Sequence, residues 1–244
     1  MSDAGQDRAT RVDTGAVYER TKASFVATVM ALPDASLQTR VPATPDWSVR
    51  DVFAHVVGLA GDLNAQRFPE PGDAGGAAWT DGQVQRGRGR AIAALRDEWD
   101  REAPIFEEGL RAFGYEMGSH FVADLHAHAQ DVRGAIGAPR ETDELTVRVA
   151  LDHYVGFVGG LLADANWGTL DAVAGAETVR LGAPGEHHAR LSATPFELLR
   201  SLSGRRSARQ IRALEWDGHA DAFVEWLRTA FSGGYALPVD DLVE

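Results

Sequence analysis

The stretch His120-Phe-Val-Ala-Asp-Leu-His-Ala-His-Ala-Gln-Asp131 has its apolar and polar side chains at the spacing of an amphipathic helix. We predict that helix over residues 116–136, ending at Gly137-Ala-Pro139. At about 100° per residue, one face collects the apolar side chains of Phe121, Leu125, Ala129, Val132 and Ile136. A separate stripe about 80° wide collects the polar side chains of His120, Asp124, His128 and Asp131. The helix therefore has one face for packing and one for chemistry.

Asp124 and His128 are four residues apart, so they project from the same face of this helix. A carboxylate and an imidazole in that arrangement can bind one divalent metal ion. The same spacing is also common in exposed ion pairs, so both interpretations stay open at this point. His126 lies about 200° from Asp124 around the helix, so it cannot share a metal with that residue.

The third ligand of such a site has to come from elsewhere, and His55 is the candidate. It lies in a helix that we predict to begin at Ser48, a suitable N-cap, with Asp51 placing negative charge in the first turn. An apolar stripe follows, formed by Val49, Val52, Phe53, Val56, Leu59, Ala60 and Leu63. His55 lies at the edge of the stripe, about 40° from Leu59, where a ligand facing an inner cleft is expected.

The other predicted helices complete a four-helix bundle with a long connection. They cover residues 14–32, ended by Pro33, and 83–113, where Pro104 is expected to kink or split the helix. Residues 1–12 are polar and expected to fray, and residues 68–82 have the composition of a loop.

The remainder of the chain mixes helices and strands. A helix is predicted over residues 143–166, a short helix after Thr194-Pro195, and a last helix over 220–231. Strands are predicted at 178–181, 189–192 and 211–216, with His187-His188 in a turn. The fold class is therefore mainly α, a four-helix bundle followed by a smaller α/β domain, divided as residues 1–140 and 141–244.

Composition excludes several classes of function. The net charge of −12 argues against binding a phosphate backbone, and Arg86, Arg88 and Arg90 are better explained as a solvated helix start than as a nucleic-acid site. The chain has no cysteine, so a metal would need His, Asp, Glu or water, and a thiol would have to come from a cosubstrate. No apolar run marks a secretory signal or a membrane span, so we expect a cytoplasmic protein without a membrane partner.

Three motifs resemble those of the mycothiol-dependent maleylpyruvate isomerase family, within the DinB-like metal-binding superfamily. Pro45-Asp-Trp-Ser-Val-Arg-Asp-Val-Phe-Ala-His55 is similar to its W-x-v-x-d-l-x-x-H helix. Asp124-Leu-His-Ala-His128-Ala-Gln-Asp131 is similar to its E-x-x-x-H-x-x-D motif, and Leu199-Arg-Ser-Leu-Ser-Gly-Arg205 to its l-x-x-l-x-G-R segment. The order and rough spacing match, so the resemblance extends over about residues 14–235.

The resemblance implies a DinB-like bundle that binds a divalent metal, usually zinc, through His55, Asp124 and His128. It also implies mycothiol or a similar thiol as cosubstrate, and an isomerase or S-transferase acting on small electrophilic carboxylates. Arg205, in the Gly-Arg segment, is the candidate clamp for the substrate carboxylate, although an ordinary helix-end arginine fits as well.

The family commonly has Glu where this chain has Asp124, and the shorter side chain requires a closer helix or a bridging water. This departure keeps two other functions open: a non-catalytic or regulatory metal-binding protein, and a metal-dependent hydrolase that uses bound water. His120 is a candidate fourth ligand, and Asp131 either orients a ligand histidine or caps local structure. The oligomeric state is not predicted.

Overall fold

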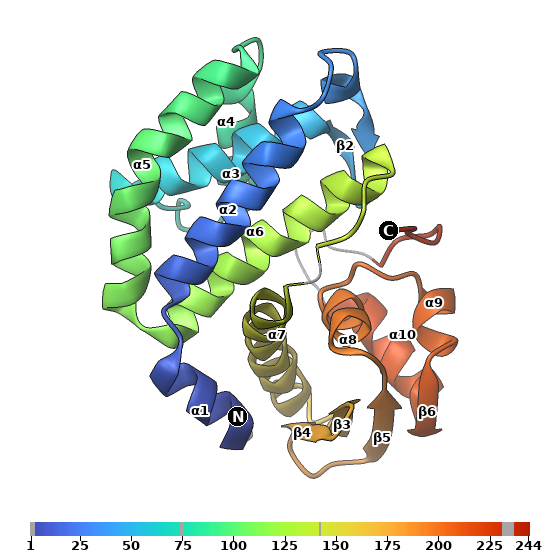
Figure 1. Ribbon diagram of the computed structural model, residues 1–244. Helices are drawn as coiled ribbons and strands as arrows, with labels where there is room; N and C mark the ends of the chain where they lie inside the picture. Colours follow the sequence, from blue (N-terminus) through green and yellow to red (C-terminus); the bar gives the residue numbers. More distant parts are fainter. Residues whose placement is uncertain (1–2, 74–75, 142, 231–236) are drawn as a thin grey trace. The chain divides into compact units, whose positions relative to one another are not determined.

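The computed structural model describes residues 3–73, 76–141, 143–230 and 237–244. The chain divides into two compact units (Figure 1). The helical unit contains residues 13–141, and the mixed unit contains residues 1–12 and 142–243. The predicted fold class is confirmed in outline, since a helical bundle is followed by a smaller α/β part. The domain limits 1–140 and 141–244 stay a prediction about which parts fold independently.

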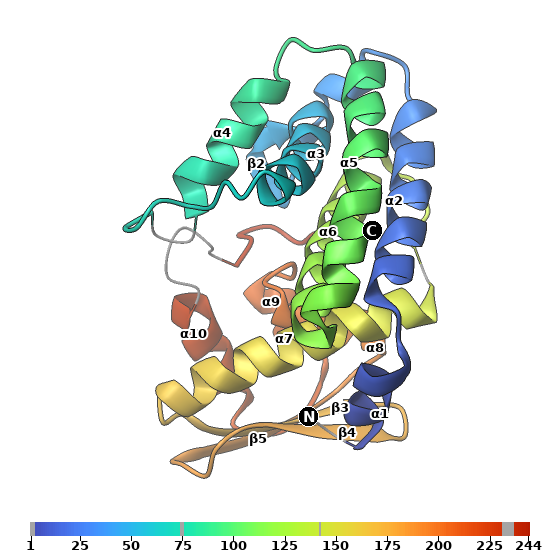
Figure 2. The same cartoon turned by 90° about the vertical axis from the view of Figure 1, so that its left-hand side faces the viewer.

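The described residues of the helical unit form five α-helices. They are α2 (Thr14–Met30), α3 (Val49–Asn64), α4 (Ala77–Gly87), α5 (Ile92–Phe113) and α6 (Tyr115–Ile136). A 3-10 turn (Ser36–Gln38) and a short antiparallel pair, β1 (Arg40–Val41) with β2 (Thr44–Ser48), occupy the connector before α3. Figure 2 shows α3 between α4 and α5, the two helices that it contacts most.

Aromatic side chains from three helices fill the core of this unit. Tyr18 and Phe25 of α2, Phe53 of α3 and Trp99 of α5 are at most 1% exposed. The rings of Phe53 and Trp99 pack edge to face with centroids 5.5 Å apart, and Tyr18 packs in the same way on Phe106 at 5.0 Å. These contacts bring α2, α3 and α5 together, which holds α3 and its histidine in place.

Two predictions for the middle of the chain are wrong. Residues 68–82 are not all loop, because α4 already begins at Ala77, where the Asp73 carboxylate accepts hydrogen bonds from the backbone N–H groups of Ala78 and Trp79. The predicted helix 83–113 is broken between α4 and α5, at Gly89 with φ +75°, while Pro104 lies inside the continuous α5. Residues 74–75 of the predicted loop lie outside the described residues.

The mixed unit combines a sheet with helices. Its strands are β3 (Gly168–Ala174), β4 (Glu177–Gly182), β5 (His187–Ser192) and β6 (Glu215–Gly218), in the order β4-β3-β5-β6. Its helices are α1 (Asp3–Arg11), α7 (Glu144–Asp164), α8 (Pro195–Leu202), α9 (Ala208–Arg212) and α10 (Ala220–Ala230). Strand β3 pairs antiparallel with β4 and parallel with β5, and α7 lies across the sheet (Figure 2). Residue 231 of the predicted last helix lies outside the described residues.

The sequence misplaced parts of this sheet. Strand β3 was missed because nearly all of its side chains are buried, so it lacks the alternation that marks a half-buried strand. His187 and His188 lie in β5 and not in a turn, and residues 211–216 are divided between α9 and β6. Gly168 has φ +127°, and a Cβ there would lie 1.9 Å from the His187 carbonyl oxygen, so the β3–β5 pairing requires glycine.

Helix α1 is anchored within the mixed unit, contrary to the expectation that residues 1–12 fray, and residues 1–2 of that prediction lie outside the described residues. Arg8 of α1 donates hydrogen bonds to both carboxylate oxygens of Asp152, at 2.7 and 2.8 Å, and to Glu177 at 3.1 Å. Two acceptors on different elements fix the position of the Arg8 side chain within the mixed unit.

Helix α7 is long and apolar enough to cross a membrane by length and composition alone, with a mean hydropathy of 1.2. Buried core helices pass the same test. In this unit α7 packs against β4 and α8, and it carries the charged Asp152 that binds Arg8. We therefore interpret α7 as a core helix of the mixed unit.

Candidate metal centre

His55, Asp124 and His128 come together in the helical unit. One ligand atom from each lies within 4.8 Å of the others. The Asp124 carboxylate lies between the two imidazoles, with one oxygen 3.6 Å from His128 Nε2 and the other 3.9 Å from His55 Nε2. Of the groups of acidic and histidine side chains among the described residues, this is the one close enough to hold a metal ion.

Local sequence places each of the three side chains. Ser48 and Asp51 form a reciprocal capping box that begins α3, so His55 sits in the second turn of a firmly started helix. Asp124 and His128 lie one turn apart on α6, which ends at Gly137 with φ +66°. The site therefore depends on two helices whose start or end is fixed by side chains close in sequence.

The donor set fits a divalent cation. Ligands about 2.1 Å from an ion in tetrahedral geometry lie about 3.4 Å from each other. The separations of 3.6 and 3.9 Å involve different oxygens of Asp124, and one ligand atom from each residue lies within 4.8 Å of the others. The three side chains therefore have to move together by up to about an ångström to reach tetrahedral spacing.

The three side chains differ in their access to solvent. The histidine side chains are 6% and 8% exposed, whereas the Asp124 side chain is 28% exposed. The carboxylate therefore forms the open side of the cluster. Three protein ligands with one open side is the arrangement of catalytic rather than structural zinc sites.

A series of buried hydrogen bonds through Gln83 to Asp62 orients the His55 ring from its Nδ1 side. Gln83 of α4 donates from its amide nitrogen to Asp62 at 3.1 Å, so its amide oxygen faces His55 Nδ1 at 2.8 Å. That oxygen can only accept, which places the imidazole proton on Nδ1 and leaves the Nε2 lone pair facing Asp124. Arg67 and Arg86 in turn donate to the Asp62 carboxylate.

The hydrogen bonds between His55, Gln83 and Asp62 require α4 to approach α3 closely. Gly58 lies beside Gln83, and a Cβ at Gly58 would be 2.8 Å from the Gln83 Cβ. Gly87 on α4 plays the same part against Ala54, where an added Cβ would lie 2.2 Å away. Two glycines, one on each helix, therefore allow Gln83 to reach the metal-ligand candidate.

Trp47 closes another side of the cluster. Its ring lies 5.2 Å from that of His55 and 6.0 Å from that of His128, measured between centroids. Asp131 is buried behind His128, with a carboxylate oxygen 3.8 Å from Nδ1, which is longer than a direct hydrogen bond. His55 is thus oriented by a hydrogen bond to a side chain, and the Asp131 carboxylate lies next to His128.

The environment favours the ionised carboxylate. Burial by itself raises the pKa of Asp124, but electrostatic interactions with the neighbouring side chains of His128, His55 and His120 outweigh it. The net effect is a pKa well below the usual range of an aspartate. An ionised carboxylate is the form that binds a metal.

The other predicted residues lie elsewhere. His126 is buried and its Nε2 lies 3.4 Å from the side-chain nitrogen of Gln130, away from the cluster as the helix geometry predicted. His120 is exposed and is not one of the three clustered residues, although its charge influences Asp124. Arg205 lies in the mixed unit, after α8, where it is buried and donates to the Ser203 carbonyl at 3.2 Å. Its role toward a substrate stays a prediction.

Sequence reasoning missed Gln83 and Asp62. Asp62 follows His55 by seven residues, so at about 100° per residue it lies about 20° from it on the same helix face. The sequence could therefore have indicated Asp62 as a partner of the site, because it is a carboxylate on the buried side of α3. Gln83 gave none, because it fell at the predicted border between a loop and a helix.

Comparison with known proteins identifies the family. The profile described as the mycothiol maleylpyruvate isomerase N-terminal domain matches residues 18–148, more than half of the chain. The chain belongs to the mycothiol maleylpyruvate isomerase family. This confirms the resemblance based on the three motifs, and two of those motifs, with His55 and Asp124 to Asp131, fall within the match. No curated protein sequence matches the chain.

Two solved structures share the fold of this family member. The crystal structure of the mycothiol-dependent maleylpyruvate isomerase aligns with a TM-score of 0.57 at 13% identity. That of a histidine-to-alanine mutant of it aligns with a TM-score of 0.56 at 12% identity. Each alignment covers 79% of this chain and 88% of the other. At such identities the likeness concerns the fold, and it supports the predicted DinB-like bundle with a smaller α/β part.

Proposed function

We propose that this protein is a metal- and thiol-dependent isomerase or S-transferase of the mycothiol type, acting on small electrophilic carboxylates. The observation that carries the proposal is the convergence of His55, Asp124 and His128 from two helices in a member of this family. We propose these three residues as the metal ligands, with zinc as the metal and mycothiol or a similar thiol as cosubstrate.

In the proposed reaction the metal activates the thiol, and the thiolate then reacts with the substrate. A bound divalent cation would lower the pKa of a thiol at its open position, making the nucleophilic thiolate available at neutral pH. The thiolate adds to one carbon of an activated cis double bond, and the pair of π electrons moves into the conjugated carbonyl group. Rotation about the resulting single bond and expulsion of the thiolate give the trans product, with no net oxidation or reduction. If the adduct is protonated and released instead, the reaction is an S-transfer.

The chain's own residues prepare this step. Gln83 keeps the His55 proton on Nδ1, so that Nε2 is free to bind a cation. Trp47 covers both imidazoles and limits access of water from that side. The partly exposed Asp124 marks the side from which thiol and substrate approach. We propose Arg205 as the clamp for the substrate carboxylate, on the basis of the family's Gly-Arg segment.

We propose a cytoplasmic location without nucleic-acid or membrane partners. A reaction that requires a reduced thiol suits a reducing compartment. The net charge of −12 disfavours nucleic acid and anionic membrane surfaces. We also propose residues 1–140 and 141–244 as the two folding domains.

The metal is tested by mass spectrometry of protein purified under metal-replete conditions. Wild type is expected to hold an equimolar divalent metal, and His55→Ala and His128→Gln to lose it. His126→Gln is the matched control, since His126 lies on α6 two residues from His128 and outside the cluster. Substoichiometric metal in wild type, or equal metal in His128→Gln and His126→Gln, would reject the site.

Catalysis is tested with the metal-loaded protein, mycothiol and maleylpyruvate, following the loss of the cis isomer with and without thiol. Thiol-dependent isomerisation that His128→Gln abolishes and His126→Gln retains is the expected result. Metal binding without thiol affinity or turnover would reject the isomerase and leave a hydrolase or a regulatory metal-binding protein.

A further inference from the structure

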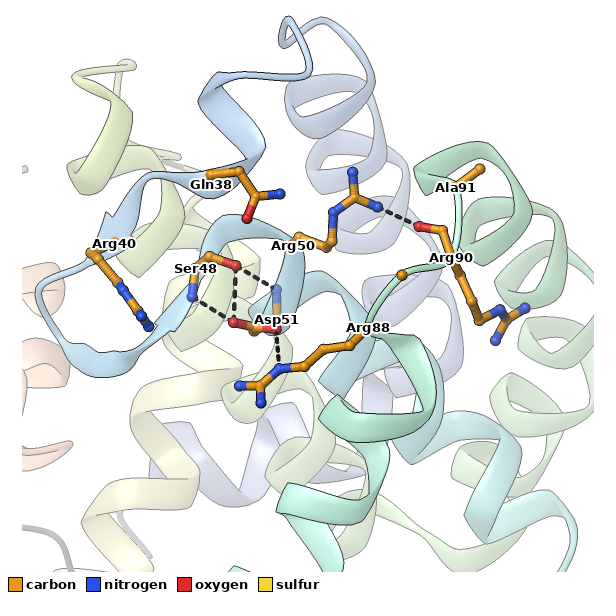
Figure 3. A pocket seen from close by; sticks show the side chains of 9 residues that line it. Gln38, Arg40, Ser48, Arg50, Asp51, Arg88, Arg90 and Ala91 are labelled. Atoms are coloured by element: carbon orange, nitrogen blue, oxygen red, sulfur yellow. Dashed lines mark hydrogen bonds and ion pairs between the residues drawn. The ribbon is translucent and has the colours of Figure 1, made fainter.

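The helical unit has an open pocket of about 720 Å³ at the N-terminal ends of α3 and α5 (Figure 3). Four of its nine lining residues are arginines and one is acidic: Arg40, Arg50, Arg88, Arg90 and Asp51. The pocket therefore has a local excess of three positive charges in a protein whose net charge is −12. A cluster of positive side chains is unfavourable unless anions offset it, because like charges repel one another.

Two of the four arginines are neutralised within the protein. Arg88 donates to the Asp51 carboxylate at 3.1 Å, and that carboxylate also accepts from the backbone and hydroxyl of Ser48. Arg90 forms an ion pair with Glu98. The Arg88–Asp51 pair is part of the α3 capping box, so these contacts also explain the basic run that the sequence showed at residues 86–90.

The other two arginines keep their charge. Arg40 donates to the carbonyl of Asp46, and Arg50 donates to the carbonyl of Arg90. No ion pair joins either guanidinium to a carboxylate among the residues that the structure describes. A carbonyl oxygen fixes the direction of a guanidinium without neutralising it, and a guanidinium has five N–H donors, so both retain capacity for an anion.

The surroundings of these two side chains favour an anion further. Figure 3 shows Arg40, Arg50 and Arg88 around the Ser48–Asp51 capping box, with the Gln38 amide on the same side as Arg50. Ala91, the N-cap of α5, lines the pocket and makes no side-chain capping hydrogen bond, so the positive end of the α5 dipole lies at the pocket wall. A volume of this size suits a small organic molecule better than a single ion.

We propose that this pocket binds a small organic anion bearing phosphate or carboxylate groups, held by Arg40 and Arg50. Guanidinium binds both groups through two parallel N–H donors. None of its lining residues is one of the three metal-ligand candidates, and the proposal does not depend on the proposed reaction. It assigns a role to arginines that the metal centre does not use.

The test is calorimetric titration of the purified full-length protein with pyrophosphate and with citrate, at ionic strength matched with sodium chloride. Saturable binding of at least one probe is expected, weakened about tenfold or more in Arg50→Gln, because the variant loses a charged hydrogen-bond donor to the anion. Preference for pyrophosphate or for citrate identifies a phosphate or a carboxylate ligand. Arg101→Gln is the matched control, since Arg101 is exposed, lies in the same unit and also donates to a carbonyl, that of Asp97.

Absence of saturable binding by both probes would overturn the proposal, and so would equal affinity in wild type, Arg50→Gln and Arg101→Gln. Arg40→Gln, at an exposed position, provides a second variant if Arg50→Gln does not fold. The metal content of each variant is measured alongside. The metal content is expected to stay at the wild-type value, so a loss of anion binding can be distinguished from a loss of metal binding.

Discussion

Gln83→Met removes the acceptor that orients His55 while keeping most of the buried volume. In the wild type, Gln83 accepts from His55 Nδ1 at 2.8 Å and donates to Asp62 at 3.1 Å. The variant leaves the imidazole free to rotate or to change tautomer, so Nε2 is no longer held toward Asp124. Asp62 keeps its contacts with Arg67 and Arg86, so no carboxylate is left buried without a charged partner.

The expected loss follows from these contacts. Removing the group that orients a metal-ligating histidine lowers metal affinity about 10- to 100-fold. That range corresponds to about 1.4–2.7 kcal/mol of binding free energy. The metal-free protein loses about 1–3 kcal/mol of unfolding free energy as well, because the Nδ1–H donor stays buried without its acceptor.

The assay is zinc titration in competition with a chromophoric chelator, together with urea unfolding of the metal-free protein. Gln85→Met is the matched control, since Gln85 is exposed on the same helix and its side chain makes a 3.5 Å contact with Asp81. A zinc dissociation constant for Gln83→Met equal to that of Gln85→Met would refute the orienting role. Lower stability with unchanged zinc affinity would reduce Gln83 to a structural residue.

Three further variants test the fold. Asp51→Asn is expected to cost about 1 kcal/mol through loss of the α3 capping box, measured by urea unfolding. Burial raises the pKa of Asp51, but hydrogen bonds from Ser48 and Arg88 outweigh it and lower the pKa below its usual value. The stabilisation is therefore complete above a pH of about 3.9 and disappears as the pH falls through the lowered pKa. The difference in unfolding free energy between wild type and Asp51→Asn should shrink in acid, and a difference that stays constant would contradict this. Trp99→Ala removes a ring that is 0% exposed, so a loss of about 3–5 kcal/mol in unfolding free energy is expected and a loss typical of a surface site would be inconsistent with the aromatic core. Arg8→Gln should make α1 cleave faster in limited proteolysis than in wild type, and an unchanged rate would show that the bonds to Asp152 and Glu177 do not anchor it.

The predictions that succeeded rest on short-range rules. The capping box at Ser48, the Thr194-Pro195 helix start and the placing of Asp124 and His128 one turn apart on α6 all depend on residues within one or two turns. The angular positions of the residues around the helix also distinguished His128, which shares a face with Asp124, from His126, which does not. The motif order then linked His55 to Asp124 and His128, although they are 69 and 73 residues apart in the sequence numbering.

The predictions that failed depend on long-range contacts. Strand β3 is buried on both faces, so its pairing partners decide its state more than its own pattern does. The N-terminal helix is held by carboxylates more than 140 residues away, a contact that no local rule contains. Pro104 does not split α5, because the packing of a long helix outweighs a local preference, while the expected kink stays a prediction.

The sequence by itself determined the ligand candidates and the helices that carry them, because helical periodicity fixes which side chains share a face. Only the tertiary structure decided what lies behind His55. Gln83 reaches it because Gly58 and Gly87 let α3 and α4 approach closely, and a side chain at either glycine would force the helices apart. The tautomer of the candidate ligand thus depends on a helix–helix distance, which is set by packing between residues distant in sequence.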